Sequence, residues 1–290
     1  MSHDQTRIVA DSMIGLSLPT SDRWSPLVFM VLGLNPGPFT GPGTNTYLIG
    51  TGADRLLLDT GQGVVEYLPL LERSIRAAGA KGICGIVLTH SHADHVGGLD
   101  SVLARFGRIP VWRMGTPSDE SEHREVCDGD SITTEGATWR AIWTPGHAGD
   151  HLCFYLTEEH ALFTGDMVLG AGTTVIPANG DLGDYLRSLH RLRSLEAEVL
   201  YPAHGPAIRD PGRKIDEYLA HRALRDRQIL ARLADAPKSI LELVGEIYTD
   251  VPEYLHGAAA LSVHAHLRKL ALEELVRQEG HLWVSARGEG

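Results

Sequence analysis

The stretch that decides the fold of this chain is Thr89-His90-Ser91-His92-Ala93-Asp94-His95-Val96-Gly97-Gly98. Its order His-x-His-x-Asp-His is not expected by chance in a chain with 15 histidines among 290 residues. His90 and His92 stand two apart on extended backbone after an apolar strand, so their imidazoles project to the same side and can share one cation. Asp94 and His95 follow where a helix begins, which turns two more ligands toward a second cation. Imidazole and carboxylate ligands without thiolate suit zinc in an open catalytic site, and also iron or manganese.

The sequence around this motif predicts a mixed α/β domain. Between residues 27 and 205, short apolar runs alternate with stretches of helical periodicity, and Gly or Pro bounds most of them. The expected strands are Val28–Gly33, Tyr47–Gly50, Arg55–Asp59, Gly85–Thr89, Trp139–Thr144, Leu152–Leu156, Ala161–Thr164 and Val199–Tyr201. The expected helices are Val65–Ala78, His95–Phe106 and Tyr185–Leu195. Several strands end in His or Asp, and in layered α/β folds sites form at the carboxyl ends of strands.

Three later residues repeat the pattern of a strand end followed by a turn. They are His147 in Thr-Pro-Gly-His, Asp166 in Thr-Gly-Asp and His204 in Tyr-Pro-Ala-His-Gly. Taken alone, each has an ordinary explanation, because a histidine is often a satisfied polar group and an Asp before a turn is often a cap. Their order after the His90–His95 motif makes them candidate metal ligands.

Together these motifs resemble the metallo-β-lactamase superfamily, and the resemblance covers about Leu27 to Pro206. It implies an αββα sandwich with two zinc ions per chain at the edge of the sheets. The first zinc is then held by His90, His92 and His147, and the second by Asp94, His95 and His204. The resemblance further implies that Asp166 bridges the two ions, that Asp94 and Asp166 are catalytic, and that a zinc-bridging hydroxide is the nucleophile. Asp59, in Leu-Asp-Thr-Gly, is expected to orient a ligand without touching the metal.

Further motifs are similar to those of the β-lactamase-like protein 2 group of single-stranded-RNA endonucleases. They include Asn35–Thr40, Gly43–Leu48 and Gly172–Val175. The same template occurs in thioesterases that release fungal polyketides from carrier proteins. We therefore expect metal-dependent cleavage of single-stranded RNA, with hydrolysis of an ester, thioester or lactam as the alternative. A third possibility is a non-catalytic nucleic-acid or partner binder. Asn45, Thr173, Thr174 and Tyr185 are expected to line the substrate pocket.

After residue 210 the alternation of strand and helix patterns gives way to mainly helical patterns, so we expect a catalytic domain over 1–210 and a second unit over 211–290. The second unit should contain helices at about Gly212–Leu233, Ser239–Tyr248 and Ala258–Gln278, and a last strand at His281–Ser285. Two helices followed by a short β element are typical of a winged helix. Such a module binds nucleic acid in some proteins and shapes a neighbouring pocket in others.

The charge distribution gives little support for a polyanionic partner. The net charge is −11, and residues 1–206 hold 14 Lys and Arg against 24 Asp and Glu. One segment, Arg213–Arg232, is locally basic, with six cationic residues against three acids. It is either a solvated helix face or the border of a nucleic-acid groove.

Composition excludes several other classes of protein. The three cysteines Cys84, Cys127 and Cys153 are widely spaced and odd in number, which argues against a disulfide framework. No apolar run approaches the roughly 20 residues that a membrane span needs. The N-terminus lacks a cationic start before its apolar patch. The sequence therefore predicts a cytoplasmic protein without a membrane partner, and leaves its oligomeric state open.

Overall fold

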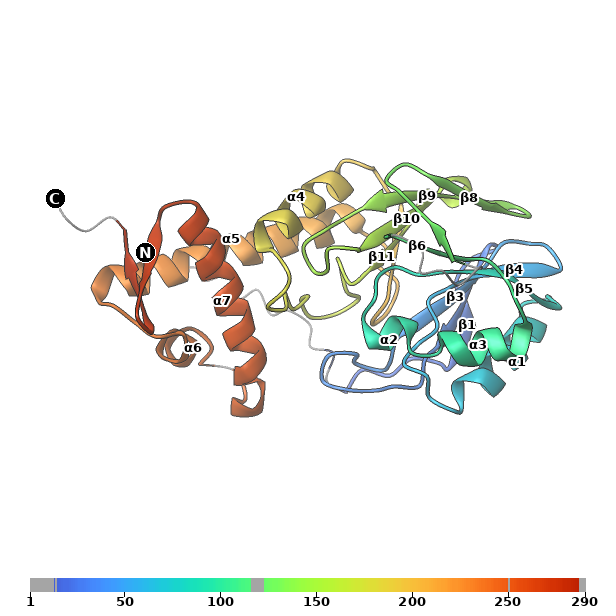
Figure 1. Cartoon of the computed structure of the whole chain (residues 1–290), viewed down its shortest axis with the longest axis horizontal. Coiled ribbons are helices and arrows are strands. Elements are labelled where there is room, and N and C mark those ends of the chain that lie inside the picture. The colour runs from blue at the N-terminus through green and yellow to red at the C-terminus, as the bar shows by residue number, and fades with distance from the viewer. Residues whose placement is uncertain (1–12, 14, 116–122, 250, 287–290) are drawn as a thin grey trace, which may run out of the picture.

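The computed structural model describes residues 13, 15–115, 123–249 and 251–286. The segment 1–12, on which the predicted cytoplasmic location partly rests, lies outside them. Within the described residues, two sheets face each other and helices cover both outer faces (Figure 1). A smaller helical module with a two-stranded sheet follows at the C-terminal end. The expected α/β sandwich with a C-terminal winged-helix module is confirmed.

The first sheet has the strand order β1-β2-β3-β4-β5-β6-β7. The strands are β1 (Ser21–Arg23), β2 (Val28–Leu32), β3 (Asn45–Ile49), β4 (Asp54–Leu58), β5 (Gly82–Val87), β6 (Val111–Arg113) and β7 (His123–Glu125). Neighbours from β1 to β4 pair antiparallel, and those from β4 to β7 pair parallel. The parallel half directs β4 and β5 toward one edge of the sheet, so residues that follow these strands meet there.

The second sheet has the order β12-β11-β10-β9-β8. Its strands are β8 (Ser131–Thr134), β9 (Ala137–Trp143), β10 (Leu152–Leu156), β11 (Ala161–Gly165) and β12 (Val199–Pro202). Only β11 and β12 run parallel, and they too end at a common edge. A short 3-10 turn, η1 (Thr157–Glu159), joins β10 to β11.

Burial on both faces explains why β2 is apolar at every position. Met30 points into the core between the sheets, with Phe154 and Phe163 of the second sheet. Val31, the next residue, packs on the outer side with Leu71 of helix α1. A strand that is covered on both faces reads as a continuous apolar run rather than as an alternating one.

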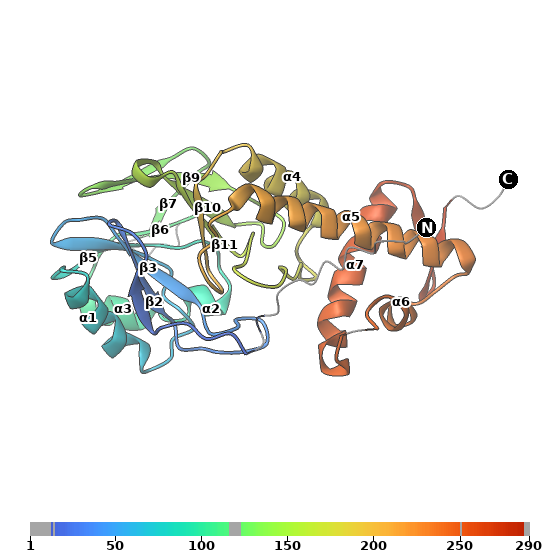
Figure 2. The same cartoon turned by 180° about the vertical axis from the view of Figure 1, so that it is seen from behind.

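The helices cover the outer faces in two pairs (Figure 2). On the first sheet lie α1 (Tyr67–Ala77) and α3 (Leu99–Phe106), with the short α2 (Ala93–Val96) at the sheet edge. On the second sheet lie α4 (Leu182–Arg193) and the first half of α5 (Pro211–Asp235). The second half of α5 continues into the C-terminal module.

The C-terminal module packs around its own core. It consists of the end of α5, α6 (Ile240–Ile247), η2 (Glu253–Leu255), α7 (His256–Leu272), β13 (Val276–Glu279) and β14 (Leu282–Ser285). Ser239 caps α6 in a capping box with Glu242. Among the described residues, no helix is long and apolar enough to cross a membrane.

The helix expected over Ala258–Gln278 is wrong at its C-terminal end. The helix stops at Leu272, and Val276 already belongs to a strand. Glu274 has a φ of 58°, and the N–H groups of Glu274 and Leu275 donate to Ala271 O and Leu270 O. This is a Schellman motif, which usually has Gly or Asn at the left-handed position. A glutamate there gives no sequence signal that the helix ends.

The helix expected over His95–Phe106 is also wrong, because it is divided at Gly97 and Gly98 into α2 and α3. The loop after β4 passes close to these glycines. A Cβ on Gly98 would lie 2.2 Å from the carbonyl oxygen of Thr60, and one on Gly97 would lie 2.6 Å from that of Gln62. The two glycines therefore allow the loop after β4 to approach the metal-ligand motif.

We expect Gly98→Ala to destabilise the protein by about 1–3 kcal/mol, because the added methyl group overlaps backbone that cannot move freely. Gly149→Ala is the matched control, since a Cβ there meets nothing within 4 Å and Gly149 has no left-handed φ. Thermal unfolding of both variants measures the difference. Equal stability of the two variants would contradict this explanation of the helix break.

Candidate metal centre

Asp59 lies at the base of the site, one residue beyond β4, in a left-handed conformation with a φ of 56°. Its buried carboxylate accepts hydrogen bonds from the backbone N–H and the hydroxyl of Thr89, at 2.8 and 2.9 Å. It also accepts one from Nδ1 of His95 at 2.8 Å. The hydroxyl of Thr89 lies 3.0 Å from Nδ1 of His90. This network places the ring proton of both histidines on Nδ1 and leaves both Nε2 atoms free to bind a metal.

Three imidazoles converge on one point at the edge of the sheets. Nδ1 of His92 lies 2.9 Å from Nε2 of His90 and 2.9 Å from Nε2 of His147. Nδ1 of His92 can donate at most one proton, so it cannot satisfy Nε2 of both His90 and His147. A cation between the three nitrogens would satisfy all of them. His147 is fixed from behind, since its Nδ1 donates to Val175 O at 2.9 Å. Burial lowers the pKa of both His90 and His147, so both rings are neutral ligands.

A second group of donors lies beside the first. Oδ2 of Asp94 is 3.5 Å from Nε2 of His95 and 3.3 Å from Nε2 of His204. Burial alone would raise the pKa of Asp94, but its contacts with His204 and His95 outweigh burial and lower the pKa. Burial also works against protonation of His204, yet Asp166 raises the pKa of His204 to about 9. Metal binding at this group would therefore release protons.

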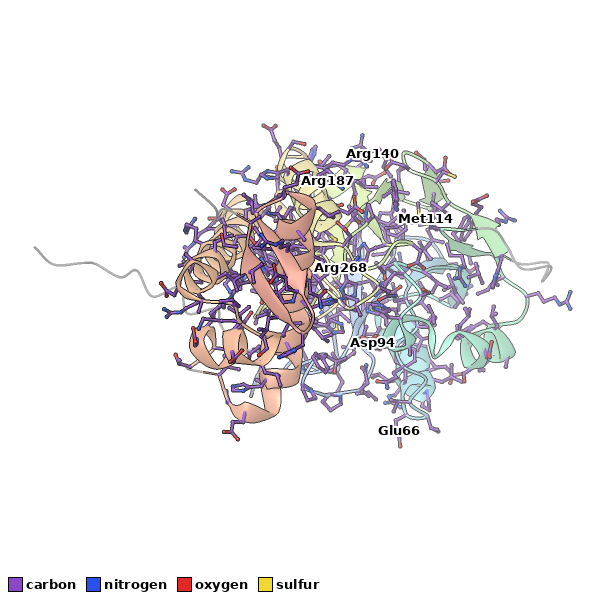
Figure 3. The ribbon with its side chains drawn as sticks, turned by 60° about the vertical axis from the view of Figure 1, so that its left-hand side comes forward. Glu66, Asp94, Met114, Arg140, Arg187 and Arg268 are labelled. Atoms are coloured by element: carbon purple, nitrogen blue, oxygen red, sulfur yellow. The ribbon has the colours of Figure 1, made fainter. Side chains whose placement is uncertain are left out.

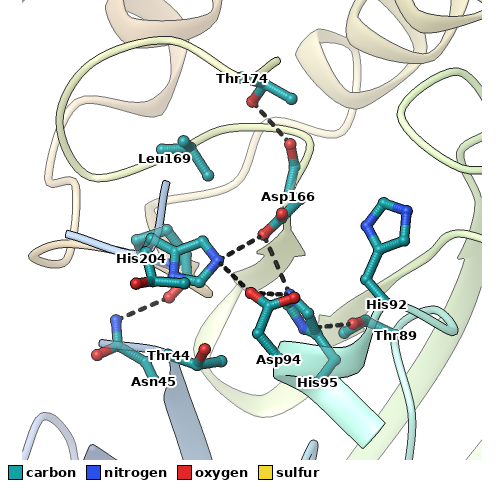
Figure 4. A network of polar contacts seen from close by, with 12 residues as sticks. Thr44, Asn45, Thr89, His92, Asp94, His95, Asp166, Leu169, Thr174 and His204 are labelled. Atoms are coloured by element: carbon teal, nitrogen blue, oxygen red, sulfur yellow. Dashed lines mark hydrogen bonds and ion pairs between the residues drawn. The ribbon is translucent and has the colours of Figure 1, made fainter. Parts of the chain in front are cut away.

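Asp166 faces both groups, because its two carboxylate oxygens point in different directions. Oδ1 lies 3.2 Å from Nε2 of His204 and 3.5 Å from Nε2 of His95. Oδ2 lies 3.4 Å from Nε2 of His147. Figure 4 shows Asp166 turned toward His204 and His95, with Asp94 on their other side. A carboxylate in this position can bridge two cations.

The donor atoms fit a divalent metal. Nε2 of His95 and Oδ1 of Asp166 are buried and face each other at 3.5 Å without a hydrogen bond of good geometry, which is costly for polar atoms unless a ligand satisfies them. The donors fall into two clusters, and within each the atoms lie within 4.8 Å of one another: His90, His92, His147 and Asp166, and separately Asp94, His95 and His204. Nitrogen and carboxylate donors without sulfur are typical of zinc or iron sites. All seven side chains that the sequence motifs single out as ligands are thus brought together.

His151 belongs to this site, although the sequence analysis did not single it out. It is fully buried, and its Nε2 accepts a hydrogen bond from the backbone N–H of Asp166 at 3.1 Å. Its Nδ1 lies 2.8 Å from the hydroxyl of Thr144. A Cβ on Gly165 would lie 2.5 Å from the ring, so only glycine lets His151 approach the backbone of Asp166. The only sequence signal is a histidine directly before an apolar strand.

Thr174 holds the loop that follows Asp166. Its hydroxyl donates to the backbone oxygen of Asp166 at 2.7 Å, and its own carbonyl accepts from the buried guanidinium of Arg222 on α5. Thr173 and Thr174 both line the cavity above the metal site, as expected. The backbone of Asp166 is therefore positioned partly by a helix that leads into the C-terminal module.

Two of the four residues expected in the pocket lie behind its wall instead. Asn45 and Tyr185 are 1% and 0% exposed, and neither lines the cavity. Asn45 donates to the carbonyls of Pro202 and Gly205, at 2.9 and 2.8 Å, and so holds the turn that carries His204. The hydroxyl of Tyr185 donates to Met167 O at 2.6 Å. The sequence around Asn45 and Tyr185 does not show on which side of the backbone their side chains lie, so the expectation that they line the pocket is wrong.

The metal site opens into a cavity of about 750 Å³. Ligand residues form its base: His92, Asp94, His147, Asp166 and His204. Its walls are mostly apolar and come from three parts of the chain, namely the loop 36–42 with Met13 and Leu16, the loop 169–177, and the C-terminal module. A charged base under apolar walls suits a substrate with one polar reacting group and an apolar body.

Comparison with known proteins agrees with this geometry. The sequence profile of the metallo-beta-lactamase superfamily matches residues 39–204, and that of the beta-lactamase associated winged helix domain matches residues 239–283. The chain is 40% identical over 279 residues to the beta-lactamase-like protein 2 homolog of Caenorhabditis elegans, covering 93% of each chain. It is 37% identical to an atrochrysone carboxyl ACP thioesterase of Paecilomyces divaricatus, covering 93% of this chain and 86% of that one.

A solved structure is similar over nearly the whole length. It is a metallo-beta-lactamase family protein from Thermus thermophilus, with a TM-score of 0.76 and 27% identity. The match covers 91% of this chain and 100% of the Thermus chain. The similarity therefore includes the C-terminal module as well as the sandwich.

We expect Asp59→Asn to weaken metal binding by about 10- to 100-fold, because an amide cannot accept hydrogen bonds from both Thr89 and His95 with the same oxygens. Zn²⁺ affinity, measured by competition with a chromophoric chelator, tests this expectation. Asp100→Asn, at an exposed position of α3, is the control. Wild-type affinity in Asp59→Asn would show that Asp59 does not orient the ligands.

We expect Thr174→Val to weaken Zn²⁺ binding several-fold and to reduce the free energy of unfolding by about 1–2 kcal/mol. The change keeps the shape of the side chain but leaves the Asp166 carbonyl without its hydroxyl donor. Thr173→Val, one residue earlier in the same loop, should change neither quantity. Chelator competition and thermal unfolding measure both, and equal behaviour of the two variants would exclude this role of Thr174.

Proposed function

The chain belongs to the metallo-β-lactamase superfamily, and from this premise we propose that it is a two-zinc hydrolase that cleaves a thioester or ester of an apolar acyl group. The observation that carries the proposal is the cavity over the metal site, whose base is polar and whose walls are apolar. A volume of about 750 Å³ lies in the range of pockets that bind small molecules. An acyl group in contact with the walls would place its carbonyl carbon over Asp94 and Asp166.

Two zinc ions are proposed because the donors form two groups that share Asp166. His90, His92 and His147 offer three nitrogens to one ion, and Asp94, His95 and His204 offer a mixed set to the other. When bound, the ions would supply a nucleophile from water at neutral pH and stabilise the negative charge that develops on the substrate oxygen. Three or four protein ligands at each ion leave a position open, which is typical of catalytic rather than structural zinc.

The side chains of the site have separate tasks in such a reaction. Asp59 and Thr89 fix the rings of His90 and His95, while His151 and Thr174 fix the backbone of Asp166. Asp94 lines the cavity with 23% of its side chain exposed, so its carboxylate can contact a water or substrate atom there. The apolar walls exclude bulk water, which strengthens the electrostatic effect of the site on the reacting carbonyl.

The charge of the surface favours an acyl substrate over a polyanion. The chain carries a net charge of −11, and its basic segment Arg213–Arg232 is largely engaged in the structure. Arg213 and Lys214 pair with Glu217, Arg232 pairs with Glu246, and Arg225 stacks on Tyr248. Arg222 is 2% exposed and bonds to the loop over the metal site. Arg213 and Arg232 remain exposed in their ion pairs, and Arg227 is exposed as well.

Two kinds of relative support different substrates. The thioesterase from Paecilomyces, whose name specifies an acyl carrier protein substrate, supports acyl transfer to water. The similarity to the Caenorhabditis homolog over 93% of both chains favours cleavage of single-stranded RNA as the second candidate, given the sequence motifs of that group. A two-metal centre suits phosphodiesters as well as acyl groups, so the apolar walls and the surface charge are the observations that support an acyl substrate.

A direct comparison of substrates tests the proposal. We expect the zinc-loaded protein to hydrolyse acyl thioesters with medium or long chains, and added salt to have little effect on the rate. EDTA should abolish the reaction, and Zn²⁺ should restore it. Metal-dependent cleavage of labelled single-stranded RNA that falls steeply with salt, without thioester hydrolysis, would favour the second candidate. If the purified protein contains no metal and turns over neither substrate, it would instead be a binding protein.

We expect His92→Ala and Asp166→Ala each to reduce turnover by at least about 10³-fold and to leave a folded protein. Both residues belong to the donor groups and not to the apolar core. His264→Ala, at a half-buried position of α7 that does not line the cavity, is the control for loss of an imidazole. Circular dichroism and steady-state kinetics measure the outcome. Retained activity in either metal-site variant would contradict the assignment.

A further inference from the structure

The C-terminal module contributes to the wall of the cavity. Leu255, at the end of η2, and Leu261, on α7, line it together with residues of the loops 36–42 and 169–177. The ligand residues and these two leucines thus border one continuous space. The module is therefore part of the substrate site and not an appendage beside it.

The position of α7 is fixed by a face of the helix that points toward the sandwich. Leu261, Ala265 and Arg268 lie at helical spacings of four and three residues, so they share one face. Ala265 packs in the core of the second sheet with Tyr185 and Leu189 of α4. Arg268 donates to Ala178 O at 2.8 Å and to Gly180 O at 3.3 Å. Figure 3 labels Arg268 where the C-terminal module meets the sandwich. Leu261 is the member of this face that reaches the cavity.

Leu261 exposes apolar surface to the cavity, and an apolar ligand in the cavity would cover that surface. Leu261 is 37% exposed, and Phe39 in the loop 36–42 is 57% exposed and lines the same cavity. Covering exposed apolar area in a cavity favours binding. Leu241 and Leu272 of the same module are 73% and 78% exposed but lie outside the cavity.

We propose that the C-terminal module selects the acyl group, and that Leu261 and Leu255 set the size of the acyl chain that the enzyme accepts. The proposal rests on the proposed function, because it assigns the wall of the same cavity. Three cations of the module have partners within it: Arg225 lies against Tyr248, Arg232 pairs with Glu246, and Lys269 pairs with Asp226. Residues at the cavity wall determine specificity without touching the reacting atoms.

Substitutions that change the size of residue 261 test this assignment. We expect Leu261→Trp to lower kcat/KM for dodecanoyl thioesters by at least about tenfold relative to acetyl thioesters, because the indole fills the space of the chain. Leu261→Ala and Leu255→Ala should shift the preferred chain length upward. Leu272→Trp, on the same helix but outside the cavity, should keep the wild-type profile. The metal content of every variant should equal that of the wild type.

A binding measurement separates this proposal from the proposed function. Titration calorimetry of dodecanoate into the zinc-loaded protein should show at least about tenfold weaker binding to Leu261→Trp and unchanged binding to Leu272→Trp. If the wild type binds dodecanoate in this Leu261-dependent way but cleaves no thioester, the proposed function is lost and the wall assignment stands. If Leu261→Trp keeps both the wild-type chain-length profile and the wild-type affinity, the wall assignment is overturned.

Discussion

The site depends on one buried carboxylate that faces two groups of imidazoles. Asp166 is 9% exposed, and its oxygens lie within 3.2 to 3.5 Å of His204, His95 and His147. The surrounding histidines outweigh burial and hold the pKa of Asp166 well below its ordinary value, so it remains charged. A charged cluster with unsatisfied hydrogen-bonding atoms is suited to binding divalent cations. The other constraints in the fold serve to hold this carboxylate and its partners in place.

The two sheets bring the donors together from distant parts of the chain. Asp59 and the His90–His95 motif follow β4 and β5 of the first sheet, whereas Asp166 and His204 follow β11 and β12 of the second. Both pairs of strands run parallel within their own sheets, so each pair ends at one edge. The packing of the sheets against each other then places the two edges side by side, with Met30 of one sheet in contact with the core of the other. Core packing is therefore a condition for the geometry of the site.

The fold and the His90–His95 motif could be predicted because they leave local signals, whereas His147, Asp166 and His204 became candidates only through their order after that motif. Apolar runs mark the central strands, and the His90–His95 motif is contiguous. The remaining features depend on tertiary contacts. His151 supports Asp166 from an ordinary position before a strand, and Asn45 faces the His204 turn instead of the cavity. The end of α7 was missed because Glu274 adopts a left-handed conformation that sequence assigns to glycine. Short strands such as β6 and β7 have three residues each, too few for a recognisable period.

The most direct measurement of the central claim is a crystal structure of the zinc-loaded protein with anomalous diffraction at the zinc edge. We expect two anomalous peaks separated by about 3.5–4 Å. One peak should lie among His90, His92 and His147, the other among Asp94, His95 and His204, and Asp166 should contact both. A single peak outside this cluster, or no zinc bound in it, would contradict the assignment of a two-metal centre.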